Sequence, residues 1–194
     1  MIALPDELSQ DLTPGARRIA DAAIDLIASR GYEELSVRAV AATAGLTGGA
    51  VQHHFPTRAA LLHAAFVRTA QRIAARVGDA PGIDDPQAFL AVLGEQLLPL
   101  DEERRKECSV WLAFSVAAIT DPDVARTHRR AVDAFQGIAE AAMHARSLPP
   151  EAAIAFIAVV DGLTIRCLTG GLAPEAALRI LRERTAYGRS GGRR

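Results

Sequence analysis

The segment 35–62 constrains the fold of this chain more than any other part of it, and it reads LSVRAVAATAGLTGGAVQHHFPTRAALL. Ser36 is suited to cap a short helix that ends at Gly45, where a residue without Cβ can adopt a left-handed conformation. Thr47 can then cap a second short helix that ends near Phe55. This spacing is typical of a helix-turn-helix, whose second helix lies in the major groove of DNA. Other helical corners share the spacing, so the pattern alone also allows two packed helices without nucleic acid.

Helical periodicity extends over the rest of the chain. Thr13-Pro14 is a capped helix start, and Gly31 ends that helix. Thr57 opens a longer helix with apolar residues on one face to about Val77. Further helices are expected at about 86–98, 108–119, 122–145, 152–168 and 174–187. Aromatic residues make up only 5%, alanine is plentiful, and no stretch alternates long enough for a sheet, so the predicted fold class is all-α.

Two domains are expected. Residues 13–60 form a three-helix DNA-binding domain, with the helix-turn-helix motif at about 37–56, and a long helix joins it to a larger helical ligand-binding and dimerisation domain at 61–188. A stretch at 78–86 that is rich in Gly, Pro and Asp is the linker that follows the long helix. The expected disordered tails are residues 1–12 and 189–194.

The net charge of −1 hides an asymmetry along the chain. Residues 13–76 contain eight arginines and four acidic residues, whereas residues 77–188 contain eleven basic and sixteen acidic residues. A positive amino-terminal module on a negative body fits phosphate binding through one end of the molecule. Chance clustering of charges is the other explanation.

The segment also resembles the amino-terminal domain of the TetR family of transcriptional regulators, over about residues 14–65. The residues that carry this resemblance are Gly31, Tyr32, Leu35, Ser36, Val37, Arg38, Ala44, Gly45, Leu46, Thr47, Gly49, His54, Phe55 and Arg58. The resemblance implies that residues 36–38 meet the DNA backbone and the edge of the groove, and that positions 47–54 face the major groove. Thr57 and Arg58 would then hold a phosphate at a helix amino terminus, a place that favours anions. The candidate DNA-binding residues are Ser36, Val37, Arg38, Thr47, Gly48, Gly49, Ala50, Gln52, His53, His54, Thr57 and Arg58.

Two residues depart from the family pattern, which usually has tyrosine in place of Gln52 and lysine in place of Arg58. Arginine keeps the positive charge and adds a forked donor, so that change is mild. Gln52 loses a phenol but gains an amide that can pair with adenine N6 and N7. Whether Gln52 reads a base or touches a phosphate stays open, and we favour a base.

Two adjacent pairs in the second helix of the motif each allow more than one explanation. Gly48 and Gly49 cost helix stability, so they indicate either close approach of backbone to DNA or a first turn that frays and tightens on binding. His53 and His54 suggest a metal site at first sight. Neighbouring residues point to different sides of a helix, however, and no third ligand has suitable spacing, so no metal site is predicted. We expect a DNA contact from His53 and partial packing of His54.

The body resembles one carboxy-terminal class of the same family, the choline-repressor-like type. The resemblance rests on Trp111-Leu112-Ala113-Phe114, Asp121-Pro122 and His128-Arg129-Arg130. It implies a ligand cavity and a dimer formed through the last two large helices. Candidate pocket residues combine apolar side chains with a few polar anchors, although each of them also suits ordinary core packing. They are Phe89, Leu93, Leu97, Trp111, Phe114, Ser115, His128 and Phe135.

The helix at 152–168 is apolar almost all round and must therefore be covered on all sides. Its small residues allow another helix to approach closely, so we expect a homodimer interface that includes the helix around Phe135. A central helix in the core of a monomer is the alternative. The candidate interface residues are Val132, Phe135, Ala142, Ala155, Ala158, Val159, Gly162 and Arg166.

Other classes of function are not indicated. The sequence contains no nucleophile elbow, no phosphate-binding glycine loop and no carboxylate pair with acid–base spacing, so we expect no enzyme and no cofactor. Cys108 and Cys167 suit buried thiols in a reducing cytosol, and neither a signal peptide nor a long apolar span is present. The prediction is a cytoplasmic, ligand-responsive repressor that binds a near-palindromic operator as a homodimer. An effector-independent regulator or an activator, and less readily a small helical enzyme, are the alternatives.

Overall fold

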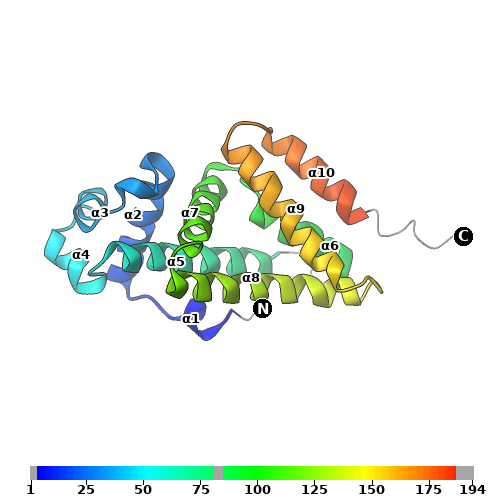
Figure 1. Cartoon of the computed structure of the whole chain (residues 1–194), viewed down its shortest axis with the longest axis horizontal. Coiled ribbons are helices and arrows are strands. Elements are labelled where there is room, and N and C mark those ends of the chain that lie inside the picture. Colours follow the sequence, from blue (N-terminus) through cyan, green and yellow to red (C-terminus); the bar gives the residue numbers. More distant parts are fainter. Residues whose placement is uncertain (1–3, 81–84, 187–194) are drawn as a thin grey trace, which may run out of the picture. The chain divides into compact units, whose positions relative to one another are not determined.

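A computed structural model describes residues 4–80 and 85–186 of the chain (Figure 1). Within these ranges the regular structure is helical and no strand occurs, so the predicted all-α class is confirmed. The elements are α1 (Asp6–Ser9), α2 (Pro14–Arg30), the 3₁₀ turn η1 (Tyr32–Glu34), α3 (Val37–Ala44), α4 (Gly48–His54), α5 (Arg58–Gly78), α6 (Pro86–Leu97), α7 (Glu102–Ala118), α8 (Pro122–His144), α9 (Glu151–Leu168) and α10 (Pro174–Ala186). Among the described helices, none is both long enough and apolar enough to cross a bilayer.

Two compact units, which alternate along the sequence, make up the structure. The first, here called the amino-terminal unit, consists of residues 4–72 and 106–131. The second, the carboxy-terminal unit, includes the described residues of 73–105 and 132–186. Helices α5, α7 and α8 therefore contribute residues to both units. The predicted functional domains at 13–60 and 61–188 concern binding roles and stay a prediction.

Local signals in the sequence set the helix starts of the amino-terminal unit. The hydroxyls of Thr13, Ser36 and Thr47 each accept a hydrogen bond of 3.2 Å from the backbone N–H three residues later. These bonds satisfy amides that the first helical turn leaves unpaired, and they confirm the predicted caps. Gly45 ends α3 at φ 63°, in the left-handed region, and this allows the sharp turn into α4.

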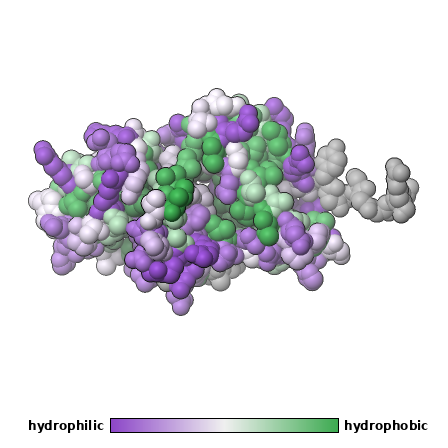
Figure 2. Space-filling view, in the orientation of Figure 1, coloured by the Kyte–Doolittle hydropathy of each residue, from purple (hydrophilic) through white to green (hydrophobic). Residues whose placement is uncertain are grey.

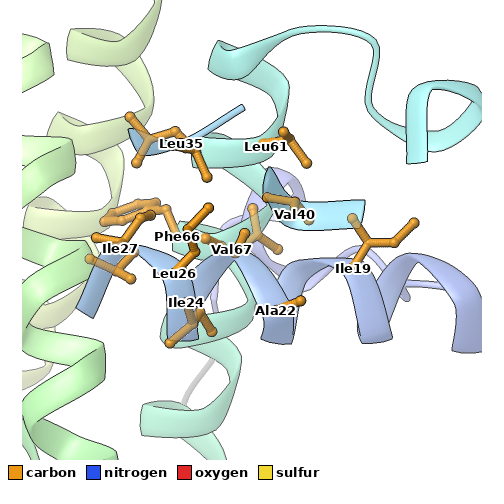
Figure 3. Packing of buried hydrophobic residues seen from close by; sticks show 14 of the residues in the cluster. Ile19, Ala22, Ile24, Leu26, Ile27, Leu35, Val40, Leu61, Phe66 and Val67 are labelled. Carbon is orange, nitrogen blue, oxygen red and sulfur yellow. The ribbon is translucent and has the colours of Figure 1, made fainter. Parts of the chain in front are cut away.

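A continuous apolar core fixes α2, α3, α4 and α5 together in this unit (Figure 3). Ile19, Leu26, Val40 and Phe66 are all at most 1% exposed. They recur at helical spacing on the inward faces of α2, α3 and α5, which is why the helices pack with those faces together. The helix-turn-helix is thus supported by α2 and α5.

Two boundaries differ from the prediction. The expected tail at 1–12 is partly ordered, because Leu8 in α1 is fully buried and Gln71 donates to the carbonyls of Leu8 and Gln10 at 3.2 and 2.8 Å. Helix α7 begins at Glu102, within the charged stretch at 101–107, and not at Cys108 as expected, because Asp101 caps it by accepting from the Arg104 amide at 2.8 Å. The expected tail at 189–194 and residues 81–84 of the expected linker lie outside the described residues.

The carboxy-terminal unit has its own core, in which α6, α9 and α10 pack against one another. Leu90 of α6 and Leu181 of α10 are 0% and 1% exposed, and Phe156 of α9 lies close to both helices near Gly94. The hydroxyl of Thr164 donates to the Leu97 carbonyl at 3.2 Å, which ties α9 to the end of α6. These contacts hold the three helices in a fixed arrangement.

Candidate nucleic-acid interface and effector site

Helix α4 presents its polar side to solvent. Val51 is 0% exposed and anchors the helix in the core, whereas the rest of the helix surface is free. The exposed residues are Thr47, Gly48, Gly49, Ala50, Gln52, His53 and His54. One inward side chain on a helix of seven residues leaves most of its surface available to a groove. The structure thus brings together the predicted reading positions on one accessible helix.

The start of α3 lies beside this surface in the same unit. Ser36 and Arg38 are exposed, and Val37 is half-buried against the core. The Ser36 hydroxyl oxygen accepts from the Ala39 amide as the cap of α3, so its O–H and the first amides of the helix remain to donate to a phosphate. This geometry suits contact with a DNA backbone.

Arg18 stabilises the turn of the motif, a role that was not predicted from the sequence. Its Nη2 donates to the Ala44 carbonyl at 2.6 Å, at the carboxy-terminal end of α3, where carbonyls lack helical partners and the helix dipole favours a cation. A Cβ placed at Gly45 would lie 3.5 Å from the same Nη2. Arg18 therefore links α2 directly to the turn that sets the direction of α4.

Thr57 and Arg58 have different local roles. Thr57 caps α5 by accepting from the Ala60 amide at 3.0 Å, as predicted. The Arg58 guanidinium lies 3.9 Å from the centre of the Tyr32 ring and donates to the Tyr32 carbonyl at 2.6 Å and to Glu33 at 3.2 Å. Arg58 thus ties η1 to the start of α5 through contacts that the sequence did not indicate. The predicted phosphate contact would have to use the part of the guanidinium that stays exposed.

His53 and His54 lie with their rings 5.4 Å apart, edge to face. A Cβ built at Gly15 would lie 3.2 Å from His54 Nε2, so His54 rests near the start of α2 while remaining exposed. In the part of the chain that the structure describes, no group of three His, Cys, Asp or Glu side chains could hold a metal ion.

Four of the eight predicted pocket residues meet in the amino-terminal unit, around Phe66. The Phe66 and Phe114 rings stack 3.8 Å apart, and Trp111 and His128 lie 5.2 and 6.4 Å from Phe66 between ring centres. Ser115 Oγ is hydrogen-bonded to His128 Nε2 at 2.8 Å. Burial lowers the pKa of His128 below its ordinary value, so the neutral imidazole is favoured in this apolar setting. We call Phe66, Trp111, Phe114, Ser115 and His128 the aromatic cluster.

The other four predicted pocket residues belong to the carboxy-terminal unit. Leu93 and Phe135 are 0% and 2% exposed and are part of its core, while Phe89 and Leu97 are half-buried. The prediction missed Phe66, the residue on which the aromatic cluster is centred. The helical spacing of Phe66 on α5 identified an apolar face of that helix, but it did not show which side chains that face contacts.

An ion-pair network crosses three helices of the amino-terminal unit. Asp21 of α2 accepts from Arg68 Nε at 2.8 Å and from Arg72 Nη2 at 2.9 Å, and Arg72 Nη1 lies 3.7 Å from Glu107 Oε1 of α7. The Glu107 side chain is only 2% exposed, so separating it from Arg72 would leave a buried carboxylate less well compensated. Lys106 makes a second link to α2 through Asp25 at 2.9 Å.

The predicted interface residues divide into exposed and buried groups. On α9, Ala155, Ala158, Gly162 and Arg166 are exposed and Val159 is half-buried. Figure 2 shows hydrophobic surface over α9, where Ile154 and Ile165 are 53% and 44% exposed. On α10, Ile180 is 37% exposed, and the prediction missed it.

The α8 candidates for the interface are corrected by their burial. Phe135 and Ala142 are 2% and 9% exposed, so they pack inside the carboxy-terminal unit and are not free to meet a partner, and Val132 is half-buried. Helical periodicity identified an apolar face of α8, but that face covers the unit's own core.

The two cysteines are both buried, as predicted for inert thiols. Burial and the nearby Glu175 carboxylate raise the pKa of the Cys167 thiol, which disfavours the reactive thiolate.

Comparison with known proteins gives matches to both halves of the chain. Residues 86–187 match the family model described as BetI-type transcriptional repressor, C-terminal, and residues 19–65 match that of bacterial regulatory proteins of the tetR family. The transcriptional regulator BetI of Stenotrophomonas maltophilia is 32% identical over 151 residues, covering 73% of this chain and 75% of that protein. The transcriptional regulator PksA of Bacillus subtilis is 35% identical over 104 residues, 53% of this chain, and the match spans half the length of PksA.

Solved structures are similar over most of the chain. A transcriptional regulator from Rhodococcus sp. Rha1 superimposes with a TM-score of 0.82 and 32% identity, covering 89% of this chain and 94% of that one. A regulator from Saccharomonospora viridis, solved in complex with choline, has a TM-score of 0.78 and 25% identity, covering 91% and 96% of the two chains.

Proposed function

Because the chain belongs to the TetR family of bacterial regulatory proteins and carries a BetI-type carboxy-terminal domain, we propose that it is a transcriptional repressor which binds a near-palindromic DNA operator as a homodimer and is released by a small molecule. The observation that carries this proposal is the exposed polar side of α4, held outward by the single buried anchor Val51. A helix with this side free can enter a major groove without rearrangement. We further propose that the protein acts in the cytoplasm.

DNA recognition would come from α4 and the start of α3. Gln52 would read a base edge, His53 and His54 would contact the groove or a phosphate, and Arg38 would meet the backbone. Eight arginines between residues 13 and 76 against four acidic residues add a positive field that favours phosphate.

The homodimer would form through α9 and α10. Ile154, Ile165 and Ile180 leave apolar surface exposed on these helices, and Ala158 and Gly162 have small side chains that allow another helix to approach closely. A two-fold axis would present two α4 helices to successive major-groove faces, about 34–36 Å apart.

The effector would act through the aromatic cluster. Aromatic faces bind quaternary ammonium groups by cation–π attraction, and the similar regulator from Saccharomonospora viridis was solved with choline. Phe66 and Phe114 stack at 3.8 Å, so a ligand would have to separate these rings and displace α7. Glu107 lies on the same helix, one turn before Trp111, and such a displacement would loosen its pairing with Arg72, which also holds Asp21 of α2. Binding could thereby change the position of the DNA-binding helices.

The test is selection of bound fragments from genomic DNA, followed by binding titrations at several salt concentrations. We expect a preferred near-palindromic site, an affinity that falls steeply with salt, and release by choline or another metabolite found by thermal shift. Sedimentation should give a dimer at micromolar concentration. Fragments with no shared sequence, or a monomer that binds the operator equally well, would refute the proposal.

A further inference from the structure

A concave site lies in the carboxy-terminal unit, away from the residues of the aromatic cluster in sequence. It is a groove of about 290 Å³ between α6, the end of α8, α9 and α10. Its volume is at the lower end of the range for small-molecule sites, about 300–1,000 Å³. The groove is formed within one unit, and three of its walls, α6, α9 and α10, come from helices that pack directly on one another.

The floor of the groove is apolar. Leu90, Leu181, Met143 and Phe156 contribute side chains that are between 0% and 6% exposed. Leu181 and Phe156 pack tightly over Gly94 of α6, which fixes their positions. An alkyl chain lying on this floor would be removed from water, which is the main source of affinity for apolar ligands.

Two arginines line the same groove. Arg146 follows the end of α8, and Arg184 lies in the last turn of α10. Within residues 4–80 and 85–186, neither forms an ion pair or a side-chain hydrogen bond, whereas Arg182, two residues before Arg184, pairs with Glu95. The negative end of the helix dipole attracts a cation and could explain one arginine near the end of α8 or α10. It does not explain why two arginines that lack acidic partners among the described residues line the same apolar groove.

From this combination we propose that the groove binds a monocarboxylate with an alkyl chain of medium length. The carboxylate lies between Arg146 and Arg184, where guanidinium groups offer paired donors, and the chain lies over Leu90, Phe156 and Leu181. Two positive charges disfavour a quaternary ammonium ion, so this ligand class is distinct from that proposed for the aromatic cluster. The inference does not depend on the proposed DNA binding.

The test is titration calorimetry of the full chain, without DNA, using octanoate as the probe. Octyltrimethylammonium and 1-octanol are the matched cationic and neutral controls. We expect saturable binding of octanoate, at least tenfold weaker binding of both controls, and about fourfold tighter binding for each methylene added between hexanoate and octanoate.

Variants locate the site. Arg146→Met with Arg184→Met keeps the apolar stems and should weaken octanoate binding about tenfold, whereas Arg179→Met on α10, outside the groove, should leave it unchanged. Ala152→Phe places a ring in the groove and should abolish octanoate binding. If Ala152→Phe lowers the melting temperature strongly, Val159→Phe fills the same groove and replaces it in the test.

Equal binding of octanoate and the ammonium probe, or unchanged octanoate binding in the double arginine variant, would overturn the proposal. It would also fail if the groove were covered by a second subunit, which would appear as no octanoate binding together with a dimer weakened by Ala152→Phe. Because DNA binding is measured separately, either outcome leaves the repressor proposal standing.

Discussion

Replacing Gly49 by alanine should change protein stability and operator affinity in opposite directions. Gly49 is the second residue of α4, it is exposed, and a Cβ built there meets no atom within 4 Å. Alanine therefore fits without a clash, and its smaller loss of conformational entropy should stabilise the fold by about 0.5–1 kcal/mol. For a chain of this size that raises the melting temperature by about 1–4 °C.

The effect on DNA binding separates the two explanations of the glycine pair. The first turn of α4 is formed and capped by Thr47 in the structure, and fraying of that turn would be reduced by alanine, which would favour operator binding. Close approach of backbone to DNA, the explanation that we favour, predicts instead that a methyl group at position 49 weakens operator binding at least tenfold, about 1.4 kcal/mol.

Thermal unfolding and a gel-shift titration of the Gly49→Ala variant measure the two effects. Gly137→Ala is the matched control, because Gly137 is an exposed helical glycine on α8 whose added Cβ also meets nothing within 4 Å. It should stabilise the protein by a similar amount and leave operator affinity unchanged. Equal or tighter operator binding by Gly49→Ala would refute the close-approach argument.

Four other changes test separate parts of the structure. Gln52→Ala should cost about 1–3 kcal/mol on the operator and relax one base position in a binding-site selection, and unchanged sequence preference would count against base reading. Gly162→Ala should stabilise the monomer, because Gly162 is exposed and an added Cβ meets no atom within 4 Å. It should weaken the dimer in sedimentation experiments, because a second subunit packed on Gly162 would leave no room for the methyl group. An unchanged dimerisation constant would exclude that position from the interface. Burial lowers the pKa of His128 below its ordinary value of about 6.5. The stability due to its neutral form is therefore complete above about pH 6.5 and is lost as the pH falls through the folded-state pKa. His128→Asn should show a smaller loss of unfolding free energy between about pH 7.5 and 5 than the natural chain. Glu107→Gln removes one carboxylate from the surroundings of Arg72 and should destabilise the protein by about 1–3 kcal/mol in urea denaturation, and a change within about 0.3 kcal/mol would show that the buried pair is energetically neutral.

Local signals made the helices and the reading surface predictable. Hydroxyl caps at Thr13, Ser36 and Thr47 act within three residues, and Gly45 needs only its own backbone conformation, so the sequence contains all the information for these features. The single inward position Val51 follows from the same periodicity. Helix starts and the orientation of α4 are therefore encoded locally.

Contacts between distant residues were not predictable in this way. Arg18 reaches Ala44 and Arg58 reaches Tyr32 across 26 residues each, and both bonds depend on how helices pack and not on spacing. The predicted pocket residues fall in both units for the same reason: apolar periodicity marks an inward face, but it does not tell which side chains that face meets. Burial alone cannot say whether an apolar residue meets a ligand, a partner or its own chain.

The placement of the unpredicted charges suggests why they are needed. The apolar core holds α2 and α5 together but has little directional preference, since dispersion and burial tolerate small shifts of one helix along another. The Asp21–Arg72–Glu107 network has directional donors, so a movement of α7 that separates the buried Glu107 carboxylate from Arg72 should cost free energy. A regulator needs two alternative arrangements that differ by a few kcal/mol, and we expect the Arg72–Glu107 pair to contribute to that difference, because Glu107 lies on α7 one turn before Trp111 of the aromatic cluster.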